Sequence, residues 1–278
     1  MASTDTPQAI RSLGQKIGRR IPHVALNELH TQKVAFHSQG DRVIALSLRG
    51  CELAAVPDEI WELGALEILS LGENQIAEFP EQIGRITQLR QFYLFNNPIT
   101  SLPSAVTRLT NLEILDLGHN KLTSIPESIG NLKNLRFLYL SDNQLTHLPE
   151  SLGELEHVIY LSMTHNRFTE LPTCVTRLQT LTELRIYNNQ IAQLPDTIAD
   201  LAELRELHAR GNQLTELPET LRKLQNLYYL DLRENAITKI PEWINGMSNL
   251  RKLDLRWNCV AEGFSSDRLN NTKLLIYV

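Results

Sequence analysis

The sequence predicts an α/β solenoid in which short parallel strands stack side by side, one strand to each repeat. Two columns of residues that recur every 23 positions predict it, together with strand-like alternation before each column. The asparagine column is Asn74, Asn97, Asn120, Asn143, Asn166, Asn189, Asn212, Asn235 and Asn258. The proline column is Pro57, Pro80, Pro103, Pro126, Pro149, Pro172, Pro195, Pro218 and Pro241. A fixed period of this length indicates repeats that bury their apolar faces by stacking.

The strand of each repeat is visible in the segment LTELRIYNN. Leu184 and Ile186 alternate with Arg185 and Tyr187, and a period of two is that of a half-buried strand. Neighbouring repeats carry similar segments, so their strands can pair at a spacing of about 4.8 Å. They must run parallel because each repeat returns to the same starting point. Arg185 and Tyr187 are therefore expected on the open side of the sheet.

The rest of the repeat supplies the turn and the return path. A buried amide must be hydrogen-bonded, so we expect the asparagines to form a ladder that bonds the turn backbone of adjacent repeats. Cys51 occupies this column in the first repeat. The proline interrupts any regular strand ladder and sets the bend. Apolar residues three apart, such as Ile198 and Leu201, then suit a short helical turn over the back of the core.

The two ends depart from the period, and a solenoid needs capped ends. Residues 1–42 are expected to form an amino-terminal cap. In this cap IRSLGQKIGRRI is a helix, and KVAFHSQGDRVIALSL is a hairpin that leads into the first repeat strand at Val43. Ten repeats are expected over residues 43–263. Residues 264–278 are expected to form a carboxy-terminal cap, in which KLLIYV is a last strand.

The motif LxxLxLxxNxLxxLPxxIxxL resembles the leucine-rich repeat family, and the resemblance covers about four fifths of the chain. The LPxxIxxL form is similar to the intracellular Ras-group repeats of scaffold proteins and to bacterial repeat proteins, including injected effectors. The resemblance implies a horseshoe-shaped solenoid with a concave parallel sheet and a role in binding other proteins. The cysteine-rich caps of secreted members are absent from this sequence, which favours an intracellular protein.

The residues that vary between repeats lie on the concave face, and these are the candidate binding residues. Aromatic residues and arginines dominate many protein interfaces, and this face carries an unusual number of both. The candidates are Tyr93, Phe95, Asp116, Phe137, Tyr139, Tyr160, Arg185, Tyr187, His208, Arg210, Asp231, Arg233, Asp254, Arg256 and Trp257. The alternative is a solvated face in which aspartates and arginines pair with one another.

Other classes of function find little support in the sequence. The net charge of −5 argues against nucleic-acid binding, and no run is long enough for a membrane span. Walker, GxSxG, HExxH and paired CxxC motifs do not occur. His119, His165 and His208 are expected to be solvated rather than zinc ligands. We therefore expect no catalysis, cofactor or metal, and three free thiols in a reducing compartment.

The sequence thus predicts a monomeric, cytoplasmic, non-enzymatic module that binds a protein or peptide on its concave face, as signalling scaffolds do. One alternative is a bacterial effector-type subunit that recruits a host or enzyme partner. Another is a phosphatase regulator, because Lys33 to Phe36 spell a basic-Val-x-Phe docking motif; an apolar cap strand accounts for the same residues. Glycan binding is a weaker alternative, because it normally accompanies secretion and the first residues lack a signal-peptide core.

Overall fold

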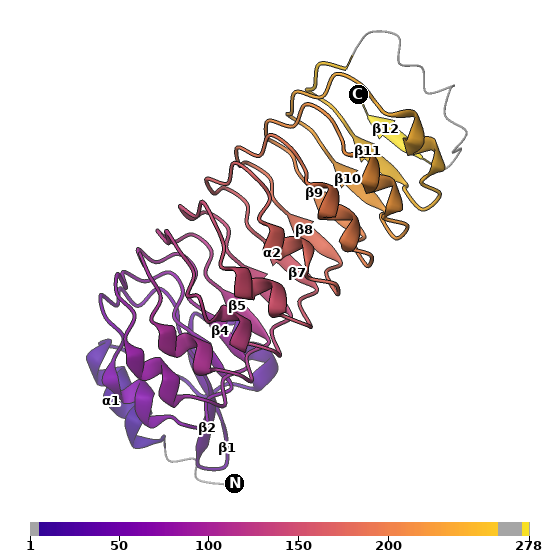
Figure 1. The fold of residues 1–278 in the computed structure, drawn as a ribbon. Coiled ribbons are helices and arrows are strands. Elements are labelled where there is room, and N and C mark those ends of the chain that lie inside the picture. Colours follow the sequence, from indigo (N-terminus) through magenta and orange to yellow (C-terminus); the bar gives the residue numbers. More distant parts are fainter. Residues whose placement is uncertain (1–5, 261–273, 278) are drawn as a thin grey trace. The chain divides into compact units, whose positions relative to one another are not determined.

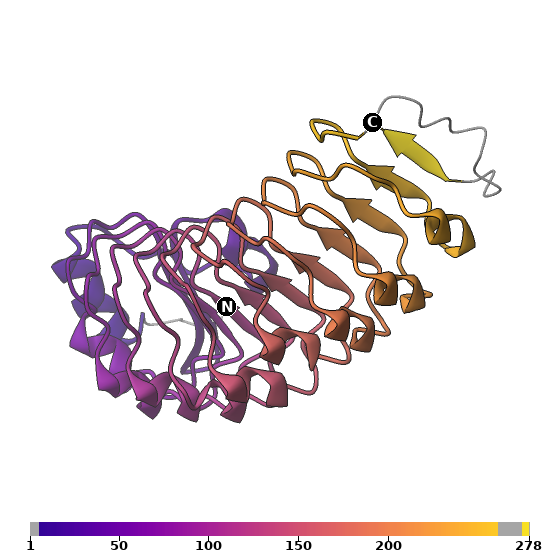
Figure 2. The same ribbon diagram turned by 45° about the horizontal axis from the view of Figure 1, so that its top comes forward.

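The computed structural model describes residues 6–260 and 274–277. By its internal contacts the chain divides into two compact units, Met1–Leu135 and Arg136–Val278. Each unit is a stack of repeats in which strands form one side and short helical turns form the other (Figures 1 and 2). No helix among the described residues is long and apolar enough to cross a membrane.

The first unit begins with a helix and an antiparallel hairpin, followed by the repeat strands. Its α-helix is α1 (Gln8–Lys16), and its strands are β1 (Val34–Gln39), β2 (Arg42–Leu48), β3 (Ile68–Ser70), β4 (Gln91–Tyr93) and β5 (Ile114–Asp116). Its 3₁₀ helices are η1 (Leu26–Thr31), η2 (Asp58–Glu62), η3 (Glu81–Arg85), η4 (Ser104–Arg108) and η5 (Ile129–Asn131). From β2 to β5 the strands pair in parallel, each in register with the next.

The second unit continues the pattern with one strand per repeat. Its strands are β6 (Phe137–Tyr139), β7 (Tyr160–Ser162), β8 (Glu183–Arg185), β9 (Glu206–His208), β10 (Tyr229–Asp231), β11 (Lys252–Asp254) and β12 (Leu275–Tyr277). Its helical turns are η6 (Glu150–Glu154), α2 (Thr173–Thr176), η7 (Asp196–Asp200), η8 (Glu219–Lys223) and η9 (Glu242–Gly246). Neighbouring strands from β6 to β12 pair in parallel.

The helical turns confirm the predicted return path. Pro195 lies immediately before η7 in an extended conformation, and its carbonyl accepts a hydrogen bond from the Ile198 N–H at 3.0 Å. Ile198 and Leu201 are both fully buried. Most turns are 3₁₀ helices, which are typically short, so each covers the core without lengthening the repeat.

The asparagine ladder is also present. The Asn74 side-chain oxygen accepts the Cys51 and Leu53 N–H groups at 2.9 and 3.1 Å, and its amide donates to the Leu48 and Leu71 carbonyls at 2.9 and 2.8 Å. Asn189 makes the corresponding bonds in the second unit. Because one amide bonds the backbone of two repeats, the column stabilises both the turn and the stacking.

The residue before each ladder position has a left-handed backbone. The non-glycine residues with a positive φ include Glu73, Asn96, His119, Asp142, His165, Asn188, Glu234 and Trp257. Gly50 and Gly211 take the same position in their repeats, at φ 60° and 63°. This conformation is costly for residues other than glycine, so the ladder and the stacked backbone must hold it in place.

The amino-terminal residues pack against the first repeat. Ile10 and Leu13 of α1 are buried, and Lys16 is ion-paired to Glu59 of η2 at 2.8 Å. β1 and β2 pair antiparallel, with Gly40 in the turn. Residues 1–5, 261–273 and 278 lie outside the described part of the chain, so most of the predicted carboxy-terminal cap does too. The boundaries of the caps and of the ten repeats stay predictions.

The phenylalanine of the basic-Val-x-Phe motif is buried, whereas Lys33 is exposed and Val34 is half-buried. Phe36 in β1 is 4% exposed. Its N–H donates to the Pro22 carbonyl, and its carbonyl accepts the Val24 N–H, both at 2.9 Å. The ring of His23 packs against it edge-on, with centroids 5.1 Å apart. The apolar-strand interpretation therefore describes this segment, and the motif is not displayed for docking.

Candidate functional site

All of the candidate residues except Trp257 occupy one side of the sheet, which we call the strand face. In the three-residue strands β3 to β11 it carries the first and third residues of the strand and the residue two positions after the third. In β8 these are Glu183, Arg185 and Tyr187, whereas Leu184 and Ile186 are fully buried. The alternation that the sequence predicted is therefore correct, and it places the predicted residues of each unit along one face, except Trp257, which takes the left-handed position before Asn258.

Most of the predicted residues are half-buried against their neighbours on adjacent strands. This group contains Tyr93, Phe95, Asp116, Phe137, Tyr139, Tyr160, Arg185, Tyr187, His208, Arg210, Arg233 and Arg256. Trp257 is 62% exposed. Asp231 and Asp254 are not on the surface, because they are 3% and 0% exposed.

Aromatic side chains gather at the start of the second unit. The rings of Tyr139 and Tyr160 have centroids 4.9 Å apart, and Phe137 lies 6.4 Å from Tyr160. The Arg185 guanidinium lies 5.5 Å from the Tyr160 ring centroid, within the range of a cation–π contact. Burial raises the pKa of the Tyr160 hydroxyl. We call Phe137, Tyr139, Tyr160 and Arg185 the aromatic patch.

Next to this patch lies an acid–base cluster that the sequence analysis missed. Arg185 Nε donates to Glu183 Oε1 at 2.6 Å, and His208 Nε2 lies 2.9 Å from Glu206 Oε2 and 3.8 Å from Glu183 Oε1. The expectation that His208 is solvated is wrong, since its side chain is 15% exposed and its ring packs edge-on against Tyr229. The sequence analysis missed Glu183 and Glu206, the first residues of β8 and β9. They lie 23 positions apart, so the repeat period could have identified them as neighbours on adjacent strands.

Glu183, Glu206 and His208 are the only described group of three metal-ligand side chains whose ligand atoms converge, within 4.8 Å of one another. The oxygen of Glu183 that faces His208 already binds the Arg185 guanidinium. That guanidinium supplies positive charge where a metal ion would have to, and it would repel a cation placed beside it. The contacts of the cluster are therefore explained by hydrogen bonds among its own side chains and the ion pair of Arg185 with Glu183.

At the far end of the second unit, two aspartates are bound by arginines from their own repeats, two residues after the strand ends. Asp231 accepts two bonds from Arg233, at 2.8 and 2.7 Å, and Asp254 accepts two from Arg256, at 2.9 and 2.7 Å. Burial opposes ionisation of Asp254, but the hydrogen bonds and charges of Arg256 and Arg233 outweigh it and lower its pKa. The aspartate–arginine pairs that the sequence analysis raised as an alternative are thus present here.

The strand face of the first unit has a different character. A cavity of about 180 Å³ there is lined by residues that include His30, Arg49, Tyr93, Phe95 and Asp116. Arg49 lies 5.2 Å from the Phe95 ring centroid and is ion-paired to Glu73 at 2.6 Å. The ring of His30 packs edge-on against Tyr93. Burial raises the pKa of Asp116.

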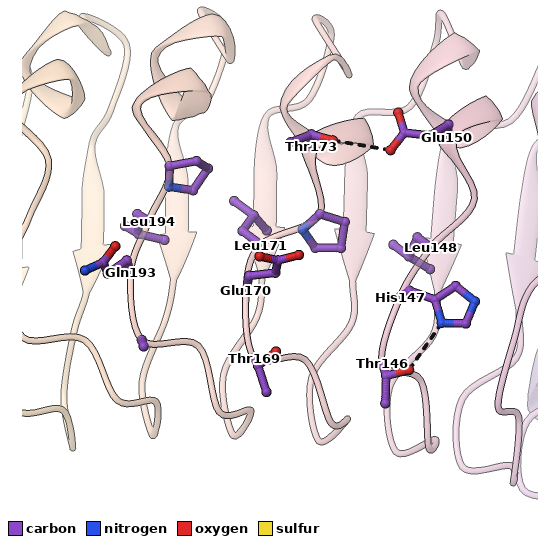
Figure 3. A pocket seen from close by; sticks show the side chains of 13 residues that line it. Thr146, His147, Leu148, Glu150, Thr169, Glu170, Leu171, Thr173, Gln193 and Leu194 are labelled. Atoms are coloured by element: carbon purple, nitrogen blue, oxygen red, sulfur yellow. Dashed lines mark hydrogen bonds between the residues drawn. The ribbon is translucent and has the colours of Figure 1, made fainter.

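A second, larger pocket lies away from the strand face. It spans three repeats along the segments that lead from the turns to the helical turns, and includes His147, Glu170 and Gln193 (Figure 3). Its volume is about 460 Å³. Equivalent positions of successive repeats form its walls, so it is a product of the repeat rather than a set of converging chemical groups.

Comparisons with known proteins agree with this architecture. A family model for a leucine-rich repeat region matches residues 81–157 and 119–212, and leucine-rich repeat models match residues 203–224 and 217–259. No curated protein matches the chain in sequence. Among solved structures, a leucine-rich repeat protein of Leptospira interrogans is 30% identical, with a TM-score of 0.79 over 93% of this chain and 70% of its own.

Two plant receptors are also similar. The ectodomain of the Arabidopsis thaliana membrane receptor kinase GASSHO1/SCHENGEN3, solved with CASPARIAN STRIP INTEGRITY FACTOR 2, is 30% identical, with a TM-score of 0.75 over 91% of this chain. The plant peptide hormone receptor RGFR1, solved with RGF2, is 30% identical, with a TM-score of 0.70 over 80% of this chain. This chain spans only 32% and 37% of those two proteins. The repeat matches and the Leptospira protein show that the chain belongs to the leucine-rich repeat proteins.

Proposed function

We propose that this chain is a non-enzymatic interaction module that binds a protein or peptide partner on its strand face, the concave face of the predicted solenoid. The observation that carries the proposal is the aromatic patch. Aromatic and arginine side chains lie together on an open sheet face, although the apolar core is built from other residues. Tyrosine and arginine are the residue types that most often dominate binding energy at interfaces.

Leucine-rich repeat relatives that bind other molecules support the same function. The two plant receptors were solved in complex with CASPARIAN STRIP INTEGRITY FACTOR 2 and RGF2. Because this chain spans about a third of each receptor, the identity of its partner does not follow from theirs. What supports the proposal here is the shared fold together with the aromatic and charged side chains of this chain.

The test compares binding with stability in a face variant. Arg185→Ala combined with Tyr187→Ala should weaken partner binding about thirtyfold, or about 2 kcal/mol, if these are interface anchors. Stability should fall by only about 1 kcal/mol, because the ion pair with Glu183 is partly exposed. The measurements are affinity capture from a native lysate, a titration with the captured partner, and a thermal melt.

The matched control changes exposed residues away from the strand face. Glu170→Ala combined with Gln193→Ala alters two exposed residues of the larger pocket (Figure 3), and it should leave both binding and stability unchanged. Asp196 and Thr197 are less suitable, because their side chains bond Thr220 and Thr176. Binding that survives in the face variant and is lost in the control would show that the partner uses the other side.

A cytoplasmic location forms part of the same proposal, supported by the cysteines. Cys51, Cys174 and Cys259 are free thiols, as expected for a protein of a reducing compartment. Cys174 is buried, and burial raises its pKa to about 11, so its thiol is unreactive. Thiol titration of the protein from its native source should find three reduced cysteines, whereas a mixed disulfide would contradict this location.

A further inference from the structure

The same strand position carries an aspartate in three repeats. Asp116, Asp231 and Asp254 are each the last residue of their strands, β5, β10 and β11. The residue two positions later is Gly118 in the first case and Arg233 or Arg256 in the other two. Residues two apart in a strand lie on the same face. The three repeats therefore differ in whether the repeat itself supplies a cationic side chain next to its aspartate.

In the second unit the arginine occupies the position next to the carboxylate. Arg233 and Arg256 each bond both oxygens of their aspartate, at distances of 2.7 to 2.9 Å. This bidentate arrangement matches the planar fork of the guanidinium to the carboxylate. These two pairs show which group the strand face of this protein uses to neutralise an aspartate at this position.

Asp116 lacks such a group. Gly118 has no side chain, and the carboxylate of Asp116 accepts one hydrogen bond, from the Gly118 N–H at 3.0 Å. Within the described part of the chain, no lysine or arginine is ion-paired with it. Burial raises its pKa, and the Gly118 hydrogen bond and the nearby His119 offset this only in part. A half-buried carboxylate is therefore left without the cation that stabilises its equivalents.

The surroundings of Asp116 suit a guanidinium. Asp116 lines the cavity of the first unit together with Tyr93 and Phe95, and Tyr93 is its partner in strand register. Guanidinium groups stack on aromatic faces, and Arg49 already lies over Phe95 in this cavity. Arg49 does not neutralise the carboxylate of Asp116, because Arg49 is ion-paired with Glu73.

We infer that Asp116 receives an arginine side chain from the partner, with Tyr93 and Phe95 beside it. The partner's guanidinium would take the place that Arg233 and Arg256 take in their own repeats. Arginine suits this position better than lysine because an ammonium group cannot form the bidentate fork. The inference rests on the proposed function and deepens it by naming the chemical group that the strand face of the first unit recognises.

The test uses a defined probe, the peptide acetyl-Gly-Arg-Gly-amide, and two analogues that carry citrulline or lysine in place of arginine. Binding is followed by the NMR shifts of the Gly118 and Asp116 backbone amides. We expect a saturable shift with the arginine peptide, at least tenfold weaker binding of the lysine peptide, and no saturable shift with the uncharged citrulline peptide. Equal responses to arginine and citrulline, or to arginine and lysine, would overturn the inference, as would no saturable response to arginine.

Two variants localise the effect. Asp116→Asn keeps the shape of the side chain and should weaken binding of the arginine peptide at least tenfold. An unchanged affinity would overturn the assignment. Gly118→Arg restores the Asp-x-Arg spacing of the second unit, so the chain's own arginine should block the peptide. Gly118 is not among the glycines with a positive φ, so its backbone conformation does not require glycine. If Gly118→Arg fails to fold, Asp116→Asn still decides.

Failure of this inference and failure of the proposed function can be told apart. The face variant at Arg185 and Tyr187 lies in the second unit, whereas Asp116 lies in the first. If a captured partner loses affinity with the face variant but not with Asp116→Asn, the arginine site is wrong and the interaction module stands. If the arginine peptide binds as expected while neither variant affects partner binding, the proposed role of the strand face is wrong.

Discussion

Asp254 and Asp116 occupy the same strand position in the two units, but their surroundings are opposite. Asp254 is fully buried, and its two oxygens are bound by Arg256. Asp116 is half-buried, and it is bonded to one backbone N–H. Strand pairing does not account for the difference, because both aspartates end a strand that pairs in parallel with the strand before it. The side chains differ: the residue two positions later is arginine in one repeat and glycine in the other, and Arg233 of the preceding repeat also lies 3.6 Å from Asp254.

This comparison separates the frame of the repeat from its face. The frame consists of the buried strand residues, the asparagine ladder and the proline-led turns, and it is the same in both units. The face consists of the residues that the frame leaves free to vary. In the second unit the charged side chains of the strand face largely pair with one another. In the first unit the carboxylate of Asp116 lies beside aromatic rings and has no such partner among the described residues.

The largest effect is expected from breaking the frame, and it should be similar in the two units. Asn97→Leu in the first unit and Asn166→Leu in the second each leave one buried turn N–H without its acceptor. The two carbonyls that each amide bonds lose that bond but keep one from the neighbouring asparagine. Each variant should lose about 3 kcal/mol of stability, because a buried unpaired N–H is costly and two further hydrogen bonds are lost. Urea unfolding of both variants tests this. A loss in only one of them would show that the ladder does not serve the units equally.

A smaller effect should separate the two aspartates. Asp254→Asn removes the charge that two arginines contact, so it should cost about 2 kcal/mol. Asp116→Asn removes a charge that has no cation, so its stability should stay within about 0.5 kcal/mol of the wild type or exceed it. Thermal melts of the two variants test the contrast. Equal losses would mean that Asp116 has a stabilising partner in the folded protein.

The pH dependence sharpens the same contrast. An aspartate in an unfolded chain has a pKa of about 3.9. The pKa of Asp254 is lowered on folding, so its contribution to stability is complete above about pH 3.9 and is lost as the pH falls through its folded pKa. The pKa of Asp116 is raised, so its contribution is complete below about pH 3.9 and is lost as the pH rises through its folded pKa.

Urea unfolding from about pH 7 to about pH 3 measures both contributions. The stability deficit of Asp254→Asn relative to the wild type should shrink as the solution becomes more acidic than about pH 3.9. The stability gain of Asp116→Asn relative to the wild type should instead shrink as the pH falls from about 7 to about 3.9. Parallel pH profiles for the two variants would contradict the assignment of opposite pKa shifts.

The smallest effect is expected at the start of the ladder. Cys51 takes the position of asparagine, and its sulfur makes one long contact, 3.8 Å from the Arg49 carbonyl. Cys51→Asn should add about 0.5 to 1 kcal/mol, because an amide can donate to this carbonyl as Asn74 does to that of Gly72. A thermal melt is sufficient, with Cys259→Ser as a control for loss of a thiol. A lower melting temperature would show that the site excludes an amide.

The sequence by itself determined the frame of this protein. The period of 23, the asparagine and proline columns and the two-residue alternation are local patterns, and each follows from backbone hydrogen bonding or apolar burial. For that reason the buried Leu184 and Ile186, the ladder bonds of Asn189 and the helical turn after Pro195 all occur where predicted. The side of the sheet on which Arg185 and Tyr187 lie follows from the same alternation.

Only the tertiary structure decided which side chains on the face pair with one another. Glu183 and Glu206 converge on His208 from two strands, and Asp254 is buried and bound by Arg256. The local sequence around these residues does not differ from that of a solvent-exposed strand. Such pairing depends on the rotamers of neighbours about 4.8 Å away on the next strand. The repeat pattern does not determine rotamers. It permits a charged side chain at this position in either case: paired within the sheet, as Asp254 is, or available to a partner, as Asp116 is.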